Sequence, residues 1–436
     1  MRINKNPTKT RTFEGTVSQK NTDEQKFIRI CCSCLLWENQ FYATGSEISK
    51  ELCSLVSKLK TAFLKEWVLK IRNEYYLRHV PLFVIREMAR IDKHKSVVAT
   101  LLTEVIQRPD ELTEFLSIYW KDKRQPLSAQ VKKGLAGAFI KFNEYSLAKY
   151  NQEKEIKLRD VLFLCHAKPI NEDQDLLWKR LISNTLAIPE TWETIVKKNT
   201  IDEWKYLLDN KKLNGLAFLR NIRNMTNAGV TTKDISSYAS TCNFNKVLPY
   251  RFIAAAKHAP SIESAIEKKM LESVDVSAKL AGKTILLIDV SGSMAEKLSD
   301  KSENTRQETA CALAILLREL CEDIEIHTFS NRVVEIPNRH GFALRDAIAN
   351  SQHHGATHLR EAVAALKDRR FDRFVIITDE QSGDGKPSDL LSEQQGYIIN
   401  VASYTNGVGH GDWITINGFS ENVIKFMQEI ENLQIS

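Results

Sequence analysis

Residues 284–294 read TILLIDVSGSM, and this stretch decides the fold of the second half of the chain. Four apolar residues, 285–288, lead directly into an Asp-x-Ser-x-Ser turn made by Asp289, Ser291 and Ser293. A buried strand that ends in a carboxylate and two hydroxyls presents hard oxygen ligands at a carboxyl-end strand tip, where open α/β sheets place their sites. The stretch therefore predicts a metal site.

Two later segments supply further oxygen donors. Thr357 precedes an amphipathic helix, and residues 374–379 (FVIITD) form a second apolar strand that ends in Asp379. The alternative is that Asp289 and Ser291 only cap the following helix. Together, these residues resemble the metal-ion-dependent adhesion site of a von Willebrand factor A domain: Asp289, Ser291, Ser293, Thr357 and Asp379.

The resemblance implies a divalent ion, usually magnesium, bound by the hydroxyls, with carboxylates that often act through water and one position open for a partner's oxygen. Mg²⁺ suits this arrangement because it keeps several waters. Around the site, a helical pattern over 306–319 alternates with short apolar strands at 324–329, 333–336 and 397–403, before a closing helix at 423–433. Such alternation predicts parallel strands with right-handed crossovers. Residues 279–436 are therefore expected to form one α/β domain.

Composition and charge describe the rest of the chain. The 436 residues, 43% hydrophobic, are enough for two or three cores. Up to residue 250 the chain has 41 Lys and Arg against 28 Asp and Glu, a net charge of +13; the remainder has 20 against 27, or −7, which together give +6. A basic first part predicts a polyanion partner, and nucleic acid is the obvious candidate.

Several classes of protein are disfavoured. No run of about 18 apolar residues occurs, and the first 15 residues lack the apolar core of a signal peptide, so we expect a cytoplasmic protein with no membrane contact. Cys31, Cys32 and Cys34 have no second Cys/His pair at zinc spacing, which favours reduced buried thiols. The sequence contains no phosphate-binding Gly-Lys-Ser/Thr motif and no recognisable catalytic triad or carboxylate pair. We therefore expect no enzymatic activity.

Residues 23–278 have almost entirely helical periodicity, with brief turns that include Pro81, Pro109, Pro126 and Pro169. Antiparallel helix pairs of this kind stack into a solenoid. Four segments resemble the TROVE module of the Ro ribonucleoprotein family, in which a von Willebrand factor A domain follows directly: 81–90 (PLFVIREMAR), 160–169 (DVLFLCHAKP), 216–225 (LAFLRNIRNM) and 248–252 (LPYRF).

The resemblance implies a multidomain α and α/β protein. Residues 1–278 would form a ring-like solenoid of HEAT-type repeats with a positively charged hole, and the Rossmann-like A domain of residues 279–436 would close the ring. Family members bind small structured Y RNAs on the outer surface and take single-stranded 3′ ends of misfolded noncoding RNAs into the hole. Bacterial members associate with a 3′ exonuclease, for which a polynucleotide phosphorylase-type enzyme is a reasonable partner. A ring within one chain needs no second subunit, so we expect a monomer.

The family's outer RNA contact includes a histidine that matches His166, beside Lys168, and a lysine that matches Lys149. A second basic position of the family appears here as Glu153 beside Lys154, which departs from the pattern. The alternative for His166 is a satisfied histidine at a helix end.

Other basic residues are candidates for RNA binding on charge alone, although a solvated helix face or an ordinary surface explains them equally well. They are Lys121, Lys123, Arg124, Lys132, Lys133, Arg220 and Arg223. The leading hypothesis is a noncatalytic RNA-binding scaffold in RNA stability and quality control. The competing hypotheses are a protein-interaction module whose metal site captures acidic partners, and a metal-dependent nuclease that uses Asp289 and Asp379.

Overall fold

The computed structural model describes residues 22–33, 45–245, 249–274, 279–297, 304–379, 394–401, 413–417 and 422–435, with the single residues 247, 383, 384, 387, 388 and 390. They fall into two compact units, each described here by itself: Thr22–Cys32 with Ser46–Lys197, and Lys198–Ser436. In the described ranges, no helix combines the length and the apolar character that a bilayer crossing requires.

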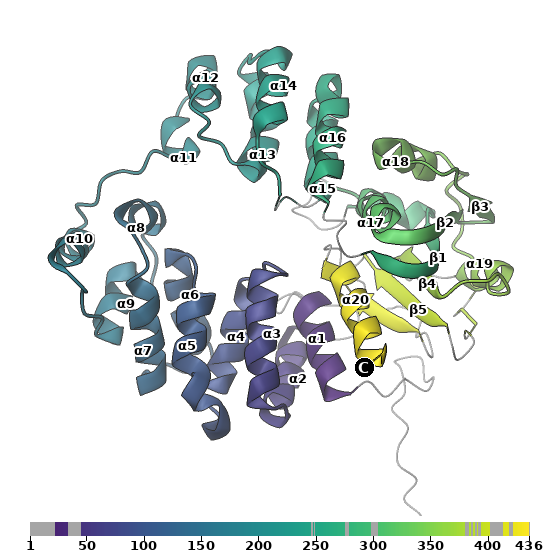
Figure 1. The fold of residues 1–436 in the computed structure, drawn as a ribbon. Coiled ribbons are helices and arrows are strands. Elements are labelled where there is room, and N and C mark those ends of the chain that lie inside the picture. Colours follow the sequence, from purple (N-terminus) through teal and green to yellow (C-terminus); the bar gives the residue numbers. More distant parts are fainter. Residues whose placement is uncertain are drawn as a thin grey trace, which may run out of the picture. The chain divides into compact units, whose positions relative to one another are not determined.

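The first unit is a helical solenoid in which the helices from α3 (Thr61–Asn73) to α9 (Leu158–Cys165) pack against one another (Figure 1). Helix α7 approaches α5 closely, since a Cβ placed on Gly134 would lie 2.7 Å from the Leu102 Cβ. The expected solenoid is confirmed. Its helices are α1 (Asp23–Ser33), α2 (Gly45–Lys58), α3 (Thr61–Asn73), α4 (His79–Met88), η1 (Asp92–His94), α5 (Lys95–Val105), α6 (Pro109–Tyr119), α7 (Ala129–Phe139), α8 (Glu144–Tyr150), α9 (Leu158–Cys165), α10 (Glu172–Ile182) and α11 (Trp192–Ile195).

Local sequence explains where several of these helices begin. Ser128, Asn143 and Asn171 are N-caps whose side-chain oxygens accept a backbone N–H from the first turn of α7, α8 and α10. Pro109 stands at the first position of α6, where its missing N–H has no cost. Short capped helices with one apolar face must pack against neighbours to be stable, which favours stacked hairpins.

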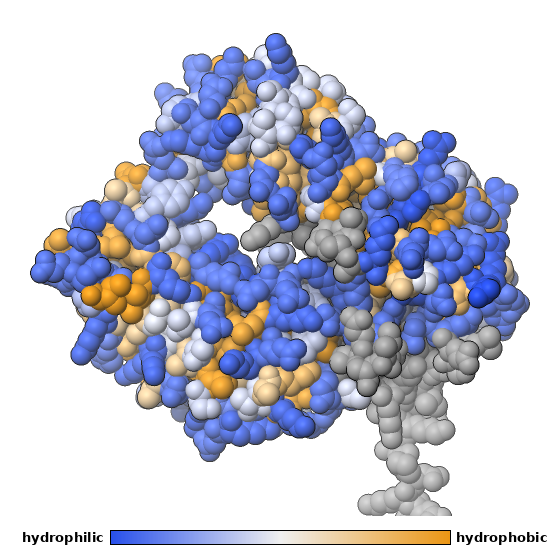
Figure 2. All heavy atoms as spheres, viewed as in Figure 1, coloured by the Kyte–Doolittle hydropathy of each residue, from blue (hydrophilic) through white to orange (hydrophobic). Residues whose placement is uncertain are grey.

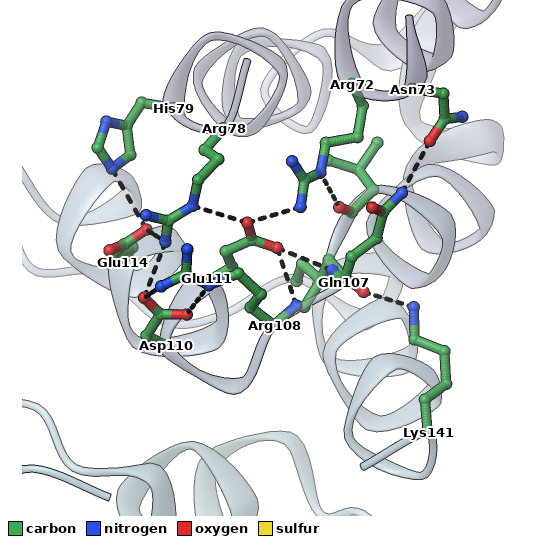
Figure 3. Close-up of polar contacts among 12 residues, drawn as sticks. Arg72, Asn73, Arg78, His79, Gln107, Arg108, Asp110, Glu111, Glu114 and Lys141 are labelled. Carbon is green, nitrogen blue, oxygen red and sulfur yellow. Dashed lines mark hydrogen bonds and ion pairs between the residues drawn. The ribbon is translucent and has the colours of Figure 1, made fainter. Parts of the chain in front are cut away.

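A buried ion network joins α3, the start of α4 and the start of α6 (Figure 3). Glu111 Oε1 accepts hydrogen bonds from Arg72 Nη2 at 2.7 Å and from Arg78 Nε at 2.9 Å. Glu111 Oε2 accepts the backbone N–H of Gln107 at 2.8 Å and of Arg108 at 3.1 Å. The Glu111 side chain is only 1% exposed, so one carboxylate joins three segments in the interior of this unit.

The second unit begins with helices and continues into a six-stranded sheet. Its elements are α12 (Ile201–Asp209), α13 (Gly215–Asn227), α14 (Thr232–Thr241), α15 (Pro249–His258), η2 (Pro260–Ile262), α16 (Glu263–Ser273), β1 (Leu280–Asp289), η3 (Gly292–Ala295), α17 (Arg306–Leu320), β2 (Cys321–Phe329), β3 (Val333–Glu335), α18 (Gly341–Ala349), α19 (Leu359–Leu366), β4 (Arg373–Thr378), β5 (Gln395–Asn400), β6 (Ile414–Asn417) and α20 (Asn422–Ile435).

The strand order is β3-β2-β1-β4-β5-β6, and the pairs from β2 through β6 are parallel. The chain adds strands on one side of β1 as far as β3 and then on its other side from β4 to β6, so the strand order reverses between β1 and β4. Helix α19 packs Leu359 and Val363 against Ile285 and Leu287 of β1, while α17 contacts β1 and β2. The expected α/β domain is confirmed, and its site edge lies at the ends of β1 and β4.

Three details differ from the expectation. Strand β3 pairs antiparallel with β2, because only a short hairpin connects them. Strand β5 ends at Asn400, and Ser403 lies outside the described residues. Strand β6 and helix α18 were not expected. With only four residues in β6 and nine in α18, the spacing of apolar side chains is too short a pattern to identify either element.

Helices α15 and α16 pack on the α/β domain within this unit. Lys257 pairs with Glu308 of α17, and Arg345 of α18 contacts Glu263 at 2.8 Å. The Phe342 N–H donates to Glu267 Oε1 at 2.5 Å. The two compact units divide at residues 197 and 198, so α12 to α16 belong to the same unit as the sheet. The expected domain bounds, 1–278 and 279–436, stay a prediction.

Candidate metal centre and RNA-binding residues

The Asp-x-Ser-x-Ser turn begins where β1 ends. Asp289 is fully buried, and its Oδ1 accepts the Ser291 N–H at 2.8 Å. The Thr378 hydroxyl donates to Asp289 Oδ2 at 2.7 Å, which ties the end of β1 to the end of β4. The Oγ atoms of Ser291 and Ser293 lie 3.3 Å apart. The first three expected donors thus share one turn.

The Thr357 loop lies against this turn. The Gly292 N–H donates to the Gly355 carbonyl at 3.3 Å, two residues before Thr357. Thr357 is buried, and its carbonyl accepts the Gly383 N–H at 2.8 Å. Asp379 follows β4 directly and is also fully buried. The fold therefore brings all five expected residues to one edge of the sheet, from segments up to 90 positions apart in the chain.

Burial and the nearby negative charge of Asp379 raise the pKa of Asp289 to about 7, although hydrogen bonds from Ser291 and Thr378 oppose the shift. Two buried carboxylates that raise each other's energy in this way favour a cation at the same edge of the sheet. The described residues contain no cluster of three or more His, Cys, Asp and Glu side chains suited to a metal. The donors at this edge are instead two carboxylates and three hydroxyls, a hard oxygen set that fits Mg²⁺ better than zinc.

Arg306 is a site residue that sequence reasoning missed. Its Nη1 donates to Asp379 Oδ2 at 3.0 Å and to the Ser293 carbonyl at 3.0 Å, and its Nη2 donates to Glu296 Oε2 at 2.9 Å. Periodicity places Arg306 at a helix start, but no local signal links it to a carboxylate 73 positions later.

Lys132 and His166 are brought together in the first unit. The Lys132 Nζ of α7 lies 3.3 Å from His166 Nε2, just after α9. His166 has a left-handed backbone (φ 53°), and its N–H caps α9 by donating to the Leu162 and Phe163 carbonyls. The backbone of His166 therefore has the capping role, while its side chain is exposed.

The other basic candidates are dispersed over the surface. Lys121, Lys123 and Arg124 are exposed after α6, where Asp122 pairs with Arg86 and Arg90. The remaining candidates are exposed or half-buried: Lys133 on α7, Lys149 at the end of α8, Lys168 after His166, and Arg220 and Arg223 on α13 in the second unit. Glu153 pairs with Lys157. RNA contact by each of these residues stays a prediction.

An exposed aromatic side chain three residues before His166 in the sequence was also missed. Phe163 of α9 is 56% exposed, and two nearby positions in the sequence are also exposed, Ile170 at 68% and Leu176 of α10 at 58%. Figure 2 shows hydrophobic side chains gathered in the area of α9 and α10, on a face that is otherwise mostly hydrophilic. Helical periodicity alone gives no sign of this exposure, since apolar residues at helical spacing are usually core.

A helical solenoid followed by an α/β domain with this oxygen cluster defines the class of protein: helical repeats combined with a von Willebrand factor A domain. Residues 283–396 match the family model described as the Ro60 vWA domain. The crystal structure of the Deinococcus radiodurans RO (RSR) protein is similar over 93% of this chain and 98% of that chain, with a TM-score of 0.67 and 15% identity. Telomerase protein component 1 of Rattus norvegicus is 19% identical to this chain over a region that covers 50% of this chain. The same region covers only 12% of that relative. Residues 283–396 of this chain therefore match a Ro-family domain, and the chain has the fold of a Ro protein.

Proposed function

We propose that this protein is a noncatalytic RNA-binding scaffold that holds a small structured RNA of the Y type and the single-stranded 3′ ends of misfolded noncoding RNAs. The observation that carries the proposal is the Lys132–His166 contact on the surface of a Ro-type solenoid. A stable RNA and a 3′ exonuclease of the polynucleotide phosphorylase type would be its partners, in small-RNA stability and quality control in the cytoplasm.

The chemistry of this pair suits RNA. A lysine ammonium only donates hydrogen bonds, so His166 Nε2 accepts from Lys132 and the proton of the neutral ring is on Nδ1. The pair therefore offers both a positive charge and an N–H donor to a phosphate. Phe163, one helical turn before His166, adds an exposed ring on which an unpaired base can stack. Charge, donor and ring together favour RNA over an acidic protein surface.

The test is a binding titration of the full chain with a labelled hairpin RNA that has a protruding 3′ tail. The double variant Lys132→Glu with Lys133→Glu should weaken binding about tenfold or more and lower the slope of log affinity against log salt by about 1 to 2. The matched control reverses the exposed Lys50 and Lys65 on α2 and α3, which changes the net charge equally.

Equal weakening by both double variants would mean that only net charge matters, and the proposed contact would be wrong. Indifference of the wild-type protein to all RNAs, with retained binding to an acidic peptide, would instead support the protein-interaction module. The apolar side chains exposed near α9 and α10 are the observation that favours this second function.

We also propose that the A domain binds Mg²⁺ through Asp289, Ser291, Ser293, Thr357 and Asp379. The buried carboxylate pair and the adjacent hydroxyls support this role. A calorimetric titration with Mn²⁺, a stand-in for Mg²⁺ with the same ligand preference, should give one site in the wild type and none in Asp289→Ala. A bound ion supplies a positive charge and an open position for a partner's carboxylate, and we expect no RNA cleavage by the purified protein with Mg²⁺. Cleavage that Asp379→Asn abolishes would support the nuclease hypothesis instead.

A further inference from the structure

A buried arginine lies in the acidic site. The Arg306 side chain is only 8% exposed, and its guanidinium reaches Asp379, the Ser293 carbonyl and Glu296 at 2.9 to 3.0 Å. Two of these three groups belong to residues proposed to hold the cation. The guanidinium therefore brings a positive charge to the place where a divalent ion would supply one.

The position of Arg306 along its helix is unfavourable for a cation. Arg306 is the first residue of α17, where Thr305 is the N-cap and the Glu308 side chain accepts the Thr305 N–H at 2.9 Å. The helix dipole favours negative charge at this end and disfavours a cation. Pairing with buried Asp379 offsets that cost, so the acidic site explains why a guanidinium is tolerated here.

The charges of the site can be summed directly. Asp289, Asp379 and the more exposed Glu296, when ionised, contribute three negative charges, and Arg306 neutralises one of them. A divalent ion that enters then meets a guanidinium that already lies 3.0 Å from the Asp379 carboxylate, in an environment where charge interactions are poorly screened.

We propose that Arg306 is an internal counter-ion of the metal site: it stabilises the carboxylates when no ion is bound and lowers the affinity for divalent cations. The inference rests on the proposed metal site. It goes beyond that site because it predicts an ion that exchanges readily at millimolar concentrations and is not permanently held. Loading of the A domain would then follow the supply of ion or of a partner's carboxylate.

The test compares Mn²⁺ binding to the full-length protein and to three variants, by calorimetry and by the loss of the free Mn²⁺ electron paramagnetic resonance signal. Arg306→Met removes the charge, and Arg306→Gln removes the charge but keeps an N–H donor for Asp379 or Ser293. Both should bind Mn²⁺ about tenfold or more tightly than the wild type. Arg306→Lys keeps the charge and should stay within about threefold of the wild type.

Thermal unfolding gives a second readout that does not depend on the affinity measurement. In a chelator, Arg306→Gln should unfold at a lower temperature than the wild type, because buried Asp379 loses the positive charge of Arg306. Saturating Mn²⁺ should raise the unfolding temperature of Arg306→Gln more than that of the wild type. This variant keeps a hydrogen-bond donor, so it tests the inference even where Arg306→Met does not fold.

The outcomes distinguish the two proposals. Equal or weaker Mn²⁺ binding by folded Arg306→Gln, with clear binding by the wild type, overturns the counter-ion role and leaves the metal site standing. Failure of both proteins to bind Mn²⁺ at millimolar concentration overturns the metal site and the counter-ion role together.

Discussion

Replacing Glu111 by Gln is the sharpest test of what holds the first unit together. The Glu111 carboxylate accepts four hydrogen bonds, two from Arg72 and Arg78 and two from backbone N–H groups (Figure 3). Every one of these partners is a donor. A glutamine has only one acceptor oxygen, so its NH₂ must face either the guanidinium groups or the backbone N–H groups.

The expected loss can be worked out from these contacts. Arg78 retains Asp110 and Glu114, each at 2.8 Å, so it keeps a counter-charge. Arg72 loses the negative charge of Glu111 and keeps its hydrogen bond to the Val105 carbonyl at 2.9 Å, while its side chain is only 8% exposed. Breaking a buried ion pair by removing one partner costs about 3–5 kcal/mol. We expect Glu111→Gln to reduce the stability of this unit by that amount.

Hydrogen exchange of the full chain is the suitable assay, because two compact units need not unfold in one step. Amides of α3 and α6 should lose protection equivalent to about 3 kcal/mol or more in Glu111→Gln. The control is Glu114→Gln, whose carboxylate is 24% exposed and contacts Arg78 and His79. It should cost no more than about 1 kcal/mol.

The reasoning would be refuted if the two variants lost equal protection in α3 and α6. The net value of the Glu111 bonds would then be small, and the stability of the solenoid would come almost entirely from apolar packing. An exchange effect confined to the last turn of α6 would equally contradict a role in joining three segments.

Three further outcomes are expected. Burial lowers the pKa of His94, whose ring bonds to Thr61 and to the Val56 carbonyl, so the unfolded chain binds the proton more tightly than the folded chain. The contribution of His94 to stability is therefore complete above about pH 6.5 and is lost as the pH falls below it. Urea titrations at about pH 7 and pH 5 should show a smaller difference in unfolding free energy for His94→Gln than for the wild type. Gly134→Ala should destabilise the first unit by about 1–3 kcal/mol in urea unfolding, because the added Cβ meets backbone atoms and the Leu102 Cβ. Gly137→Ala should cost less, because its added Cβ meets only the Thr103 side chain. Asp289→Ala should leave hairpin-RNA affinity within about twofold in an anisotropy titration, because the proposed phosphate contacts lie on other elements; a collapse of RNA affinity in a folded Asp289→Ala protein would contradict this division of roles.

Local patterns were sufficient for much of the fold. The apolar run into Asp289 predicted β1 and its turn, and the helical periodicity of residues 23–278 predicted helices with one buried face, such as α2 with Leu52, Leu55 and Val56. Strand β6 was missed, because four residues do not distinguish a strand from a loop. Ring closure, which the family resemblance implies, stays a prediction.

The amino-acid sequence by itself determined most of the elements and the set of candidate oxygen donors, because helical or strand periodicity and the Asp-x-Ser-x-Ser turn are properties of neighbouring residues. Only the tertiary structure decided that Arg306 pairs with Asp379, that Lys132 meets His166 and that Phe163 remains exposed. The physical reason is that charge pairing and exposure depend on which distant segments come together, and no local pattern encodes the distance between two such side chains.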